Sequence, residues 1–295
     1  MVDTVLSGGW IIDGTRTPPY QADLCIQDGK IVAISPQWEG NCRTRVDVTG
    51  KIVSPGFIDI HTHSDTCPFS AVFPESKVAQ GITLEIVGNC GVSAVPILPS
   101  CQAEQTAYLR KISEIPVPEE AVRDASVQKY AAHVAQTGYP SHLGTLIGQG
   151  TLRAGIGGFQ DRPLTPSEME QMKFLLDDQL NQGALGLSLG LIYPPGSFSP
   201  TSELRELARV VQKHKKILAV HMRNEGPNIF QAVEEMLSIA EETGVHLHIS
   251  HLKLMGKAQW GQAPRLLERI EASRQRGAVV TCDQYPYTAT STILA

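Results

Sequence analysis

After Pro55 and Gly56, short apolar runs alternate with amphipathic helical segments at intervals of about 30 residues, the length of a βαβ unit. This alternation predicts an α/β fold in which parallel strands form a (β/α) barrel. A closed barrel of this kind has about eight strands, one more than the runs we identify. The predicted strands are residues 57–61, 83–87, 143–147, 184–189, 217–221, 245–250 and 278–282.

Three of the intervening helices have recognisable ends. One is predicted over residues 201–214, with Thr201 or Ser202 as the N-terminal cap. A second covers residues 227–243 and ends at Gly244, and a third covers residues 264–276 and is followed by Gly277. These helices separate the last predicted strands.

Residues 1–54 have a different character. Short β-type runs are separated by turn signals such as Asp13-Gly14 and Asp28-Gly29, and no helix-length amphipathic pattern occurs. We therefore predict two domains. Residues 1–54 form the N-terminal part of a small β-sandwich domain, and residues 55–295 form the barrel.

Composition excludes several classes of protein. With 42% hydrophobic and 19% charged residues, the chain is too apolar to be disordered, and its net charge of −5 argues against nucleic-acid binding. No apolar run is long enough to span a membrane, and the N-terminus lacks a signal peptide, so we expect a cytoplasmic protein. Most of the six cysteines, which form no CxxC pair, are expected to be reduced thiols.

Five potential metal ligands lie at or just beyond the predicted strand ends, on the rim where parallel barrels place their active sites. Imidazole and thiolate together suit zinc. Each residue alone is more often a hydrogen-bonded histidine or a buried thiol, and their shared position favours the metal. His246 and His248 alternate along their strand with Leu247, Ile249 and His251, so their side chains point to the opposite face from His251. We therefore predict that His246 and His248 face the helix layer or the lower barrel and are not ligands. The five candidates are His61, His63, Cys90, His221 and His251.

Several motifs resemble the amidohydrolase superfamily and, within it, the N-acyl-D-amino-acid deacylase (D-aminoacylase) family. The resemblance covers essentially the whole chain. Its most specific parts are the Cys90 motif and the long glycine-rich run. The matching segments are residues 54–63, 88–91, 183–196, 221–225, 248–253 and 283–291.

The resemblance implies a TIM-like barrel and a zinc-dependent enzyme. Metal-activated water would hydrolyse the amide bond of a small-molecule N-acyl-D-amino acid. One tightly bound zinc would be held by Cys90, His221 and His251, and a second, weaker metal position would use His61 and His63. The substrate-binding residues would be Lys253, Tyr285 and Ser291, with Arg223, Glu225 and Asp59 in supporting roles.

The sequence departs from the family pattern in two places. The acid–base aspartate of the family lies at the end of the eighth strand, which would follow Ala295, so the catalytic residue stays unassigned. We expect a fragment that needs its C-terminal segment or a complementing chain. The alternatives are a truncated, non-catalytic metal-binding paralogue and a cyclic-amide hydrolase of the dihydroorotase or hydantoinase type, which normally uses a lysine in place of Cys90. Gln149 stands where many relatives have histidine.

Overall fold

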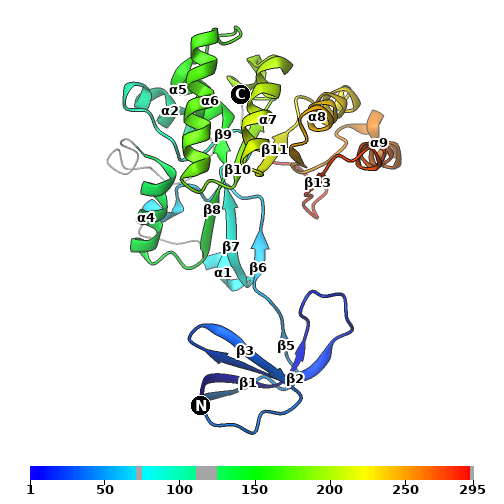
Figure 1. The fold of residues 1–295 in the computed structure, drawn as a ribbon. Helices are drawn as coiled ribbons and strands as arrows, with labels where there is room; N and C mark the ends of the chain where they lie inside the picture. The colour runs from blue at the N-terminus through cyan, green and yellow to red at the C-terminus, as the bar shows by residue number, and fades with distance from the viewer. Residues whose placement is uncertain (71–74, 111–124, 293–295) are drawn as a thin grey trace. The chain divides into compact units, whose positions relative to one another are not determined.

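The computed structural model describes residues 1–70, 75–110 and 125–292 (Figure 1). The chain divides into two compact units, Met1–Phe57 and Ile58–Ala295. Each unit is described below by itself.

The smaller unit contains one five-stranded sheet with the order β3-β2-β1-β4, and β5 also pairs with β1. The predicted turn between residues 26 and 31 is confirmed, because β2 and β3 are antiparallel and Asp28 and Gly29 both have positive φ. The described residues of this unit form a single sheet, so the β-sandwich stays a prediction. The strands are β1 (Val2–Ile11), β2 (Tyr20–Gln27), β3 (Lys30–Ser35), β4 (Cys42–Asp47) and β5 (Ile52–Val53).

The larger unit contains the predicted alternation of strands and helices, which confirms the α/β class. Its strands form two sheets, with the orders β6-β7-β8 and β13-β12-β11-β10-β9. The pairs from β9 to β13 are all parallel, as is the pair of β7 with β8. The strands are β6 (Phe57–Asp59), β7 (Ile82–Val87), β8 (His142–Thr145), β9 (Ile147–Gly148), β10 (Gly186–Gly190), β11 (Ile217–His221), β12 (His246–Ile249) and β13 (Val280–Cys282).

The prediction of one strand over residues 143–147 is wrong. The segment is divided at Leu146 into β8 and β9, which belong to different sheets. The Leu146 amide donates to the carbonyl of Val87 at 2.9 Å, whereas Ile147 is paired with Leu187 on β10. The chain therefore changes its neighbour at this point, which apolar periodicity does not reveal.

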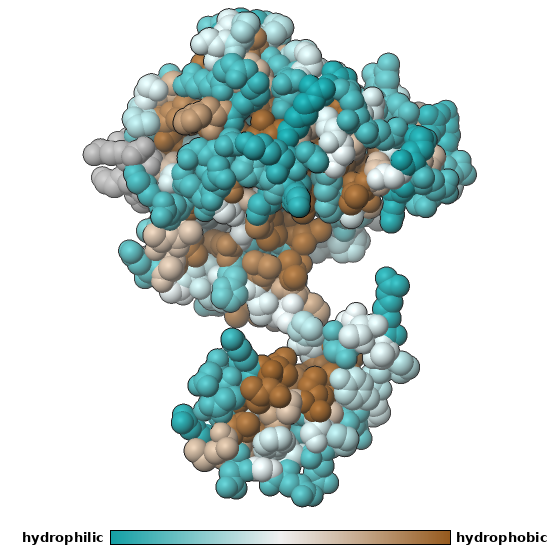
Figure 2. All heavy atoms as spheres, viewed as in Figure 1, coloured by the Kyte–Doolittle hydropathy of each residue, from teal (hydrophilic) through white to brown (hydrophobic). Residues whose placement is uncertain are grey.

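Helices follow the strands along the sequence of the larger unit. Figure 2 shows that the surface formed by these helices is largely hydrophilic. Within the described residues, no helix combines the length and apolar composition that crossing a membrane requires. The α-helices are α1 (Glu75–Ala79), α2 (Gln102–Leu109), α4 (Val127–Thr137), α5 (Gln149–Ile156), α6 (Pro166–Asn181), α7 (Thr201–Lys213), α8 (Ile229–Thr243) and α9 (Ala263–Gln275). The short 3₁₀ helices are η1 (Cys67–Phe69), η2 (Pro99–Cys101), η3 (Gly196–Phe198) and η4 (Lys257–Gln259).

The predicted helix ends are only partly correct. Gly244 follows α8 with a left-handed φ of 70°, as expected for a helix C-terminus. The predicted cap of α7 is wrong, because its N-cap is Pro200 and no side chain caps it. The hydroxyl of Thr201 instead donates to Glu235 of α8 at 2.7 Å, so an interhelical contact replaces the local cap.

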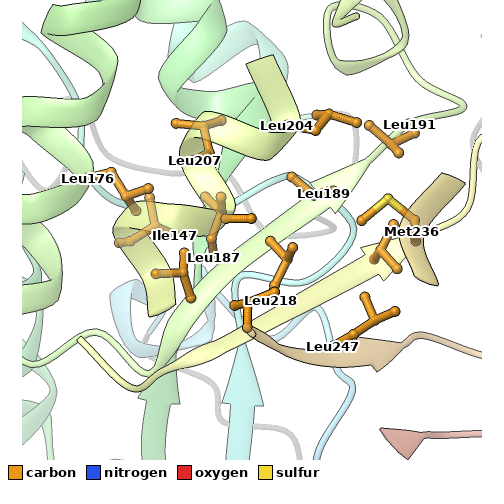
Figure 3. Packing of buried hydrophobic residues seen from close by; sticks show 14 of the residues in the cluster. Ile147, Leu176, Leu187, Leu189, Leu191, Leu204, Leu207, Leu218, Met236 and Leu247 are labelled. Carbon is orange, nitrogen blue, oxygen red and sulfur yellow. The ribbon is translucent and has the colours of Figure 1, made fainter. Parts of the chain in front are cut away.

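The main core lies between the strands and helices α6, α7 and α8 (Figure 3). Leu187, Leu218 and Leu247, on β10, β11 and β12, are all completely buried. Deleting such a side chain typically costs about 2–5 kcal/mol. This packing fixes which face of each strand meets the helices. Because Leu247 and Ile249 face the core beside the helices, the alternating His246 and His248 point to the other face of the sheet. The alternative that these two histidines face the helix layer is therefore wrong, and their position in the lower barrel stays a prediction.

Candidate metal centre

A cavity of about 860 Å³ lies where several strands of the larger unit end. The predicted ligands all line it, although they come from segments far apart in the sequence. Arg223 and Gln149 do not appear among its lining residues. The predicted site residues that do are Asp59, His61, His63, Cys90, His221, Glu225, His251, Lys253, Tyr285 and Ser291.

Cys90 is buried in the turn that follows β7. Its φ of 54° is positive, a conformation that costs a non-glycine residue energy. In this turn its Sγ lies 3.3 Å from Nε2 of His61 and 3.6 Å from Nε2 of His251. Burial, reinforced by the charges of Asp283 and Glu225, raises the pKa of the thiol. The six cysteines are free thiols in the structure.

His221, at the end of β11, is buried and has unsatisfied ring nitrogens. Among the described residues neither Nδ1 nor Nε2 has a hydrogen-bond partner. Its ring packs edge-on against His251, with 4.4 Å between the centroids. Burial and the neighbouring His251 lower the pKa of His221 to about 3, so the ring is neutral and both nitrogens lack the contacts that buried imidazoles usually make.

Glu225 connects two of the predicted site residues. One of its carboxylate oxygens lies 3.0 Å from Nδ1 of His251 and 2.5 Å from Nζ of Lys253. Burial alone would raise the pKa of Glu225, but the hydrogen bond from His251 and the charges and hydrogen bond of His221 and Lys253 lower it to about 2. The carboxylate is therefore ionised, and its contact with His251 leaves the other nitrogen of that ring directed towards Cys90.

His61 and His63 follow β6, with 5.7 Å between their ring centroids. Asp59 accepts a hydrogen bond from the His61 amide at 3.2 Å and is paired with Lys77 of α1. Burial, with the nearby His61 and His251, lowers the pKa of His63 to about 4. Asp59 thus contacts the main chain of a candidate ligand, and its supporting role stays a prediction.

The described residues contain two sets of three side chains that could hold a metal ion, and within each set the potential ligand atoms all lie within 4.8 Å of one another. The first contains His61, Cys90 and His251, and the second contains His221, Glu225 and His251. His251 belongs to both sets, whereas His63 belongs to neither. The predicted tight site of Cys90, His221 and His251 therefore draws on both sets, and its exact membership stays a prediction.

The predicted substrate-binding residues also meet at this cavity. Nζ of Lys253 lies 2.9 Å from Nδ1 of His251 and 5.7 Å from the centre of the Tyr285 ring. Its ion pair with Glu225 means that an incoming carboxylate has to share or replace that partner. Ser291 lines the same cavity in a segment without regular secondary structure.

Arg223 lies beside the cavity and organises its wall. Its guanidinium donates to the carbonyls of Ser197 and Ser199 at 3.0 Å each, and it is paired with Glu235 of α8 at 3.0 Å. These contacts hold the segment after β10 against α8. Gln149, at the start of α5, donates to the Ser199 hydroxyl at 2.8 Å and so supports the same segment.

Sequence reasoning missed two residues of the site. Tyr193 lines the cavity and packs its ring against His221, with 4.8 Å between centroids. Asp283 lies 3.1 Å from Nδ1 of His61 and 2.9 Å from Nε2 of His248. Burial would raise the pKa of Asp283, but hydrogen bonds from His248 and His61 hold it well below its usual range. The sequence signal that could have identified Asp283 as a site residue was its position just after a strand end, like that of His61.

The turn containing Cys90 depends on a glycine in the neighbouring strand. A Cβ at Gly190 would lie 2.0 Å from the carbonyl oxygen of Cys90, so an alanine there requires the turn to move. We expect Gly190→Ala to lower the free energy of unfolding by about 1–3 kcal/mol in urea denaturation. Gly226→Ala is the control, because its Cβ would meet nothing closer than 3.5 Å. Equal stability of the two variants would contradict this account.

Comparison with known proteins identifies the family of the chain. The model of the amidohydrolase family matches residues 44–279. A D-aminoacylase and an N-acyl-D-glutamate deacylase, both from Alcaligenes xylosoxydans xylosoxydans, are each 36% identical over 99% of this chain, which covers 59% and 58% of their lengths. The crystal structure of an N-acyl-D-glutamate deacylase from Bordetella bronchiseptica, complexed with zinc and a phosphonate inhibitor, is 37% identical with a TM-score of 0.87.

That comparison covers 97% of this chain and 59% of the solved chain. The chain thus spans about three fifths of the length of the relatives it matches. The resemblance inferred from the motifs is confirmed, and the chain belongs to the amidohydrolase family.

Proposed function

We propose that this chain carries the metal centre of a zinc-dependent hydrolase that cleaves the amide bond of N-acyl-D-amino acids. The observation that carries the proposal is the convergence of one thiol and three imidazoles, Cys90, His61, His221 and His251, on one cavity. The similarity to a D-aminoacylase and to a zinc-bound N-acyl-D-glutamate deacylase supports it.

The residues present fit zinc. Nitrogen and sulfur donors are the ligands zinc prefers, and a set drawn from separate turns leaves a coordination position open for water or substrate. His221 supports this reading, because its buried ring nitrogens have no hydrogen-bond partner in the described part of the chain and would gain one from a metal. We propose Cys90, His221 and His251 for the tight position, and His61 and His63 for the weaker one.

When bound, zinc would polarise the amide carbonyl and lower the pKa of the attacking water. The chain's own residues have distinct tasks. Nδ1 of His251 would carry the ring proton when Nε2 binds the metal, and Oε1 of Glu225 lies 3.0 Å from Nδ1, where it would accept that proton's hydrogen bond. Lys253 supplies positive charge for the substrate carboxylate, with Tyr285 and Ser291 on the same wall. We propose that the acid–base aspartate of the family pattern comes from a further segment or a complementing chain.

The test combines metal analysis with a substrate panel. We expect about one tightly bound zinc per chain. In the protein that includes the complementing segment, we expect hydrolysis of N-acetyl-D-amino acids and little turnover of the L-enantiomers. The panel is read by release of the free amino acid. A purified wild-type protein without stoichiometric zinc would contradict the proposal.

The same panel separates the two alternatives. Hydrolysis of hydantoins or dihydroorotate without turnover of linear N-acyl-D-amino acids would indicate a cyclic-amide hydrolase. Bound zinc without any hydrolysis would indicate a non-catalytic metal-binding paralogue. Cys90 favours the linear substrates, because the cyclic-amide enzymes normally use a lysine at its position.

Three further predictions concern the barrel strands, the domain bounds and the cellular location. We propose that the strands after residue 55, with the consecutive segments β8 and β9 counted as one, are seven of the eight strands of a TIM-like barrel. We propose that residues 1–54 form one part of a small β-sandwich domain and that residues 55–295 form the barrel domain. The cytoplasmic location also stays a prediction.

A further inference from the structure

We propose that Asp283 is a positioning residue that holds ligands of both metal positions at once, an inference that rests on the proposed metal centre. Asp283 follows β13 and lines the cavity. One carboxylate oxygen, Oδ2, lies 3.1 Å from Nδ1 of His61, and the other, Oδ1, accepts the His251 amide at 2.5 Å. A single side chain thus touches a ligand of the weaker position and a ligand of the tight one.

The contact with His61 determines which ring nitrogen can bind a metal. An ionised carboxylate only accepts hydrogen bonds, so Nδ1 of His61 carries the proton and donates it to Asp283. The lone pair is then on Nε2, the atom that lies 3.3 Å from Sγ of Cys90. Carboxylate partners commonly fix ligand histidines in this way. Asp283 therefore keeps His61 in the tautomer that presents Nε2 to the site.

The contact with His251 acts on the main chain. His251 has a φ of 37°, a left-handed conformation that costs a residue with a side chain energy. The turn is held by Asp283 at three points, the side-chain bond to the His251 amide, a 2.9 Å bond from the Leu252 amide to the Asp283 carbonyl, and a 3.1 Å bond from the Asp283 amide to Ile249. Asp283 thereby supports the conformation that places the His251 ring.

A chain of side chains behind Asp283 fixes the carboxylate in turn. His248 donates from Nε2 to the carboxylate at 2.9 Å and accepts at Nδ1 from the Thr281 hydroxyl at 2.8 Å. The same hydroxyl accepts from Nε2 of His246 at 3.0 Å. In this arrangement the ring N–H of His246, the Thr281 hydroxyl and the ring N–H of His248 each donate one hydrogen bond. The tautomers of the two histidines are therefore compatible with each other. The histidine pair that is not expected to bind metal thus gains a role through Asp283.

This geometry requires a carboxylate rather than a side chain of the same shape. The three groups that face Asp283 are the ring N–H of His61, the ring N–H of His248 and the amide of His251, and all three donate. Asparagine offers one accepting oxygen and one donating NH₂. In either orientation of its amide, at least one donor would therefore face another donor.

The experiment measures zinc affinity in the whole chain by competition with a chelator, for wild type, Asp283→Asn and the control Cys282→Ser. We expect Asp283→Asn to bind zinc about 10–100-fold more weakly, the range found when an outer partner of a ligand is removed. Cys282 is the exposed last residue of β13, directly before Asp283, so its variant should match wild type. In the cobalt-substituted protein, the thiolate-to-cobalt absorption should shift in Asp283→Asn only.

The outcomes are separable. Wild-type zinc affinity and an unchanged cobalt spectrum in a folded Asp283→Asn protein would overturn the positioning role. Failure of the wild type itself to bind zinc would instead overturn the proposed function beneath it. If circular dichroism shows that Asp283→Asn does not fold, the zinc affinity of His248→Ala tests the positioning role instead. This variant removes one donor to the carboxylate and touches no ligand, so about 10-fold weaker binding supports the role and unchanged binding overturns it.

Discussion

Replacing Cys90 with alanine is expected to remove the proposed tightly bound zinc and, in the protein that includes the complementing segment, the proposed hydrolysis of N-acyl-D-amino acids. Cys90 supplies the sulfur of the donor cluster, 3.3 Å from His61 and 3.6 Å from His251. Cys90 is the only cysteine among the described residues that line the cavity, so no other thiol there replaces it. We expect less than about 10% of the wild-type zinc by elemental analysis and a rate lowered on the order of 10³-fold or more.

The matched control is Cys101→Ala. Cys101 is also a free thiol, but it does not line the cavity and its sulfur contacts only the neighbouring Ser100 among the bonds described. This variant should retain zinc and activity. Full zinc occupancy in Cys90→Ala would contradict the assignment of the sulfur ligand, whereas loss of zinc from both variants would point to a general effect of removing thiols.

The largest expected effect on stability comes from Glu203→Ala. Glu203 of α7 lies 2.5 Å from Nη1 of Arg153 on α5, and its other oxygen accepts the Leu164 amide at 2.6 Å. Arg153 is only 1% exposed, so removing Glu203 leaves a buried positive charge without its carboxylate partner and, among the residues described, with only the hydrogen bond to the Arg162 carbonyl. We expect the free energy of unfolding to fall by about 3–5 kcal/mol, measured by urea denaturation.

Glu206→Ala provides the comparison on the same helix. The side chain of Glu206 is 41% exposed and paired with Arg209 at the surface. An exposed pair of this kind contributes between about 0 and 1 kcal/mol, so the variant should unfold close to wild type. Similar losses in the two variants would show that burial of the Arg153 pair is not what stabilises it.

The sequence predicted most of the strands and the positions of the candidate ligands for a simple physical reason. Apolar runs that pack against helices must be buried, and the residues that follow them in parallel strands meet at one rim. His221 is the clearest example, because the predicted strand and β11 have the same limits. The turn residues Cys90 and His251 reach the same cavity although their positive φ values break the strand pattern.

Other features depend on contacts between distant segments, which a single sequence does not show. The cap of α7 could not be identified because Thr201 pairs with Glu235 on another helix. The importance of Asp283 was not visible because its partner His61 is 222 residues away. Lys253 was expected to await a substrate carboxylate, and only the fold shows that Glu225 already contacts it.

The convergence of ligands from β6 to β12 has a consequence for how the protein matures. His61 and His251 can meet only after the intervening chain has folded, since their contacts join segments with a very large sequence separation. Such distant contacts form slowly, because loop-closure entropy opposes them until late. Zinc capture should therefore report completion of the tertiary structure rather than formation of any local segment. Added zinc should stabilise the folded state by an amount that grows with the logarithm of the ratio of the zinc concentration to its dissociation constant.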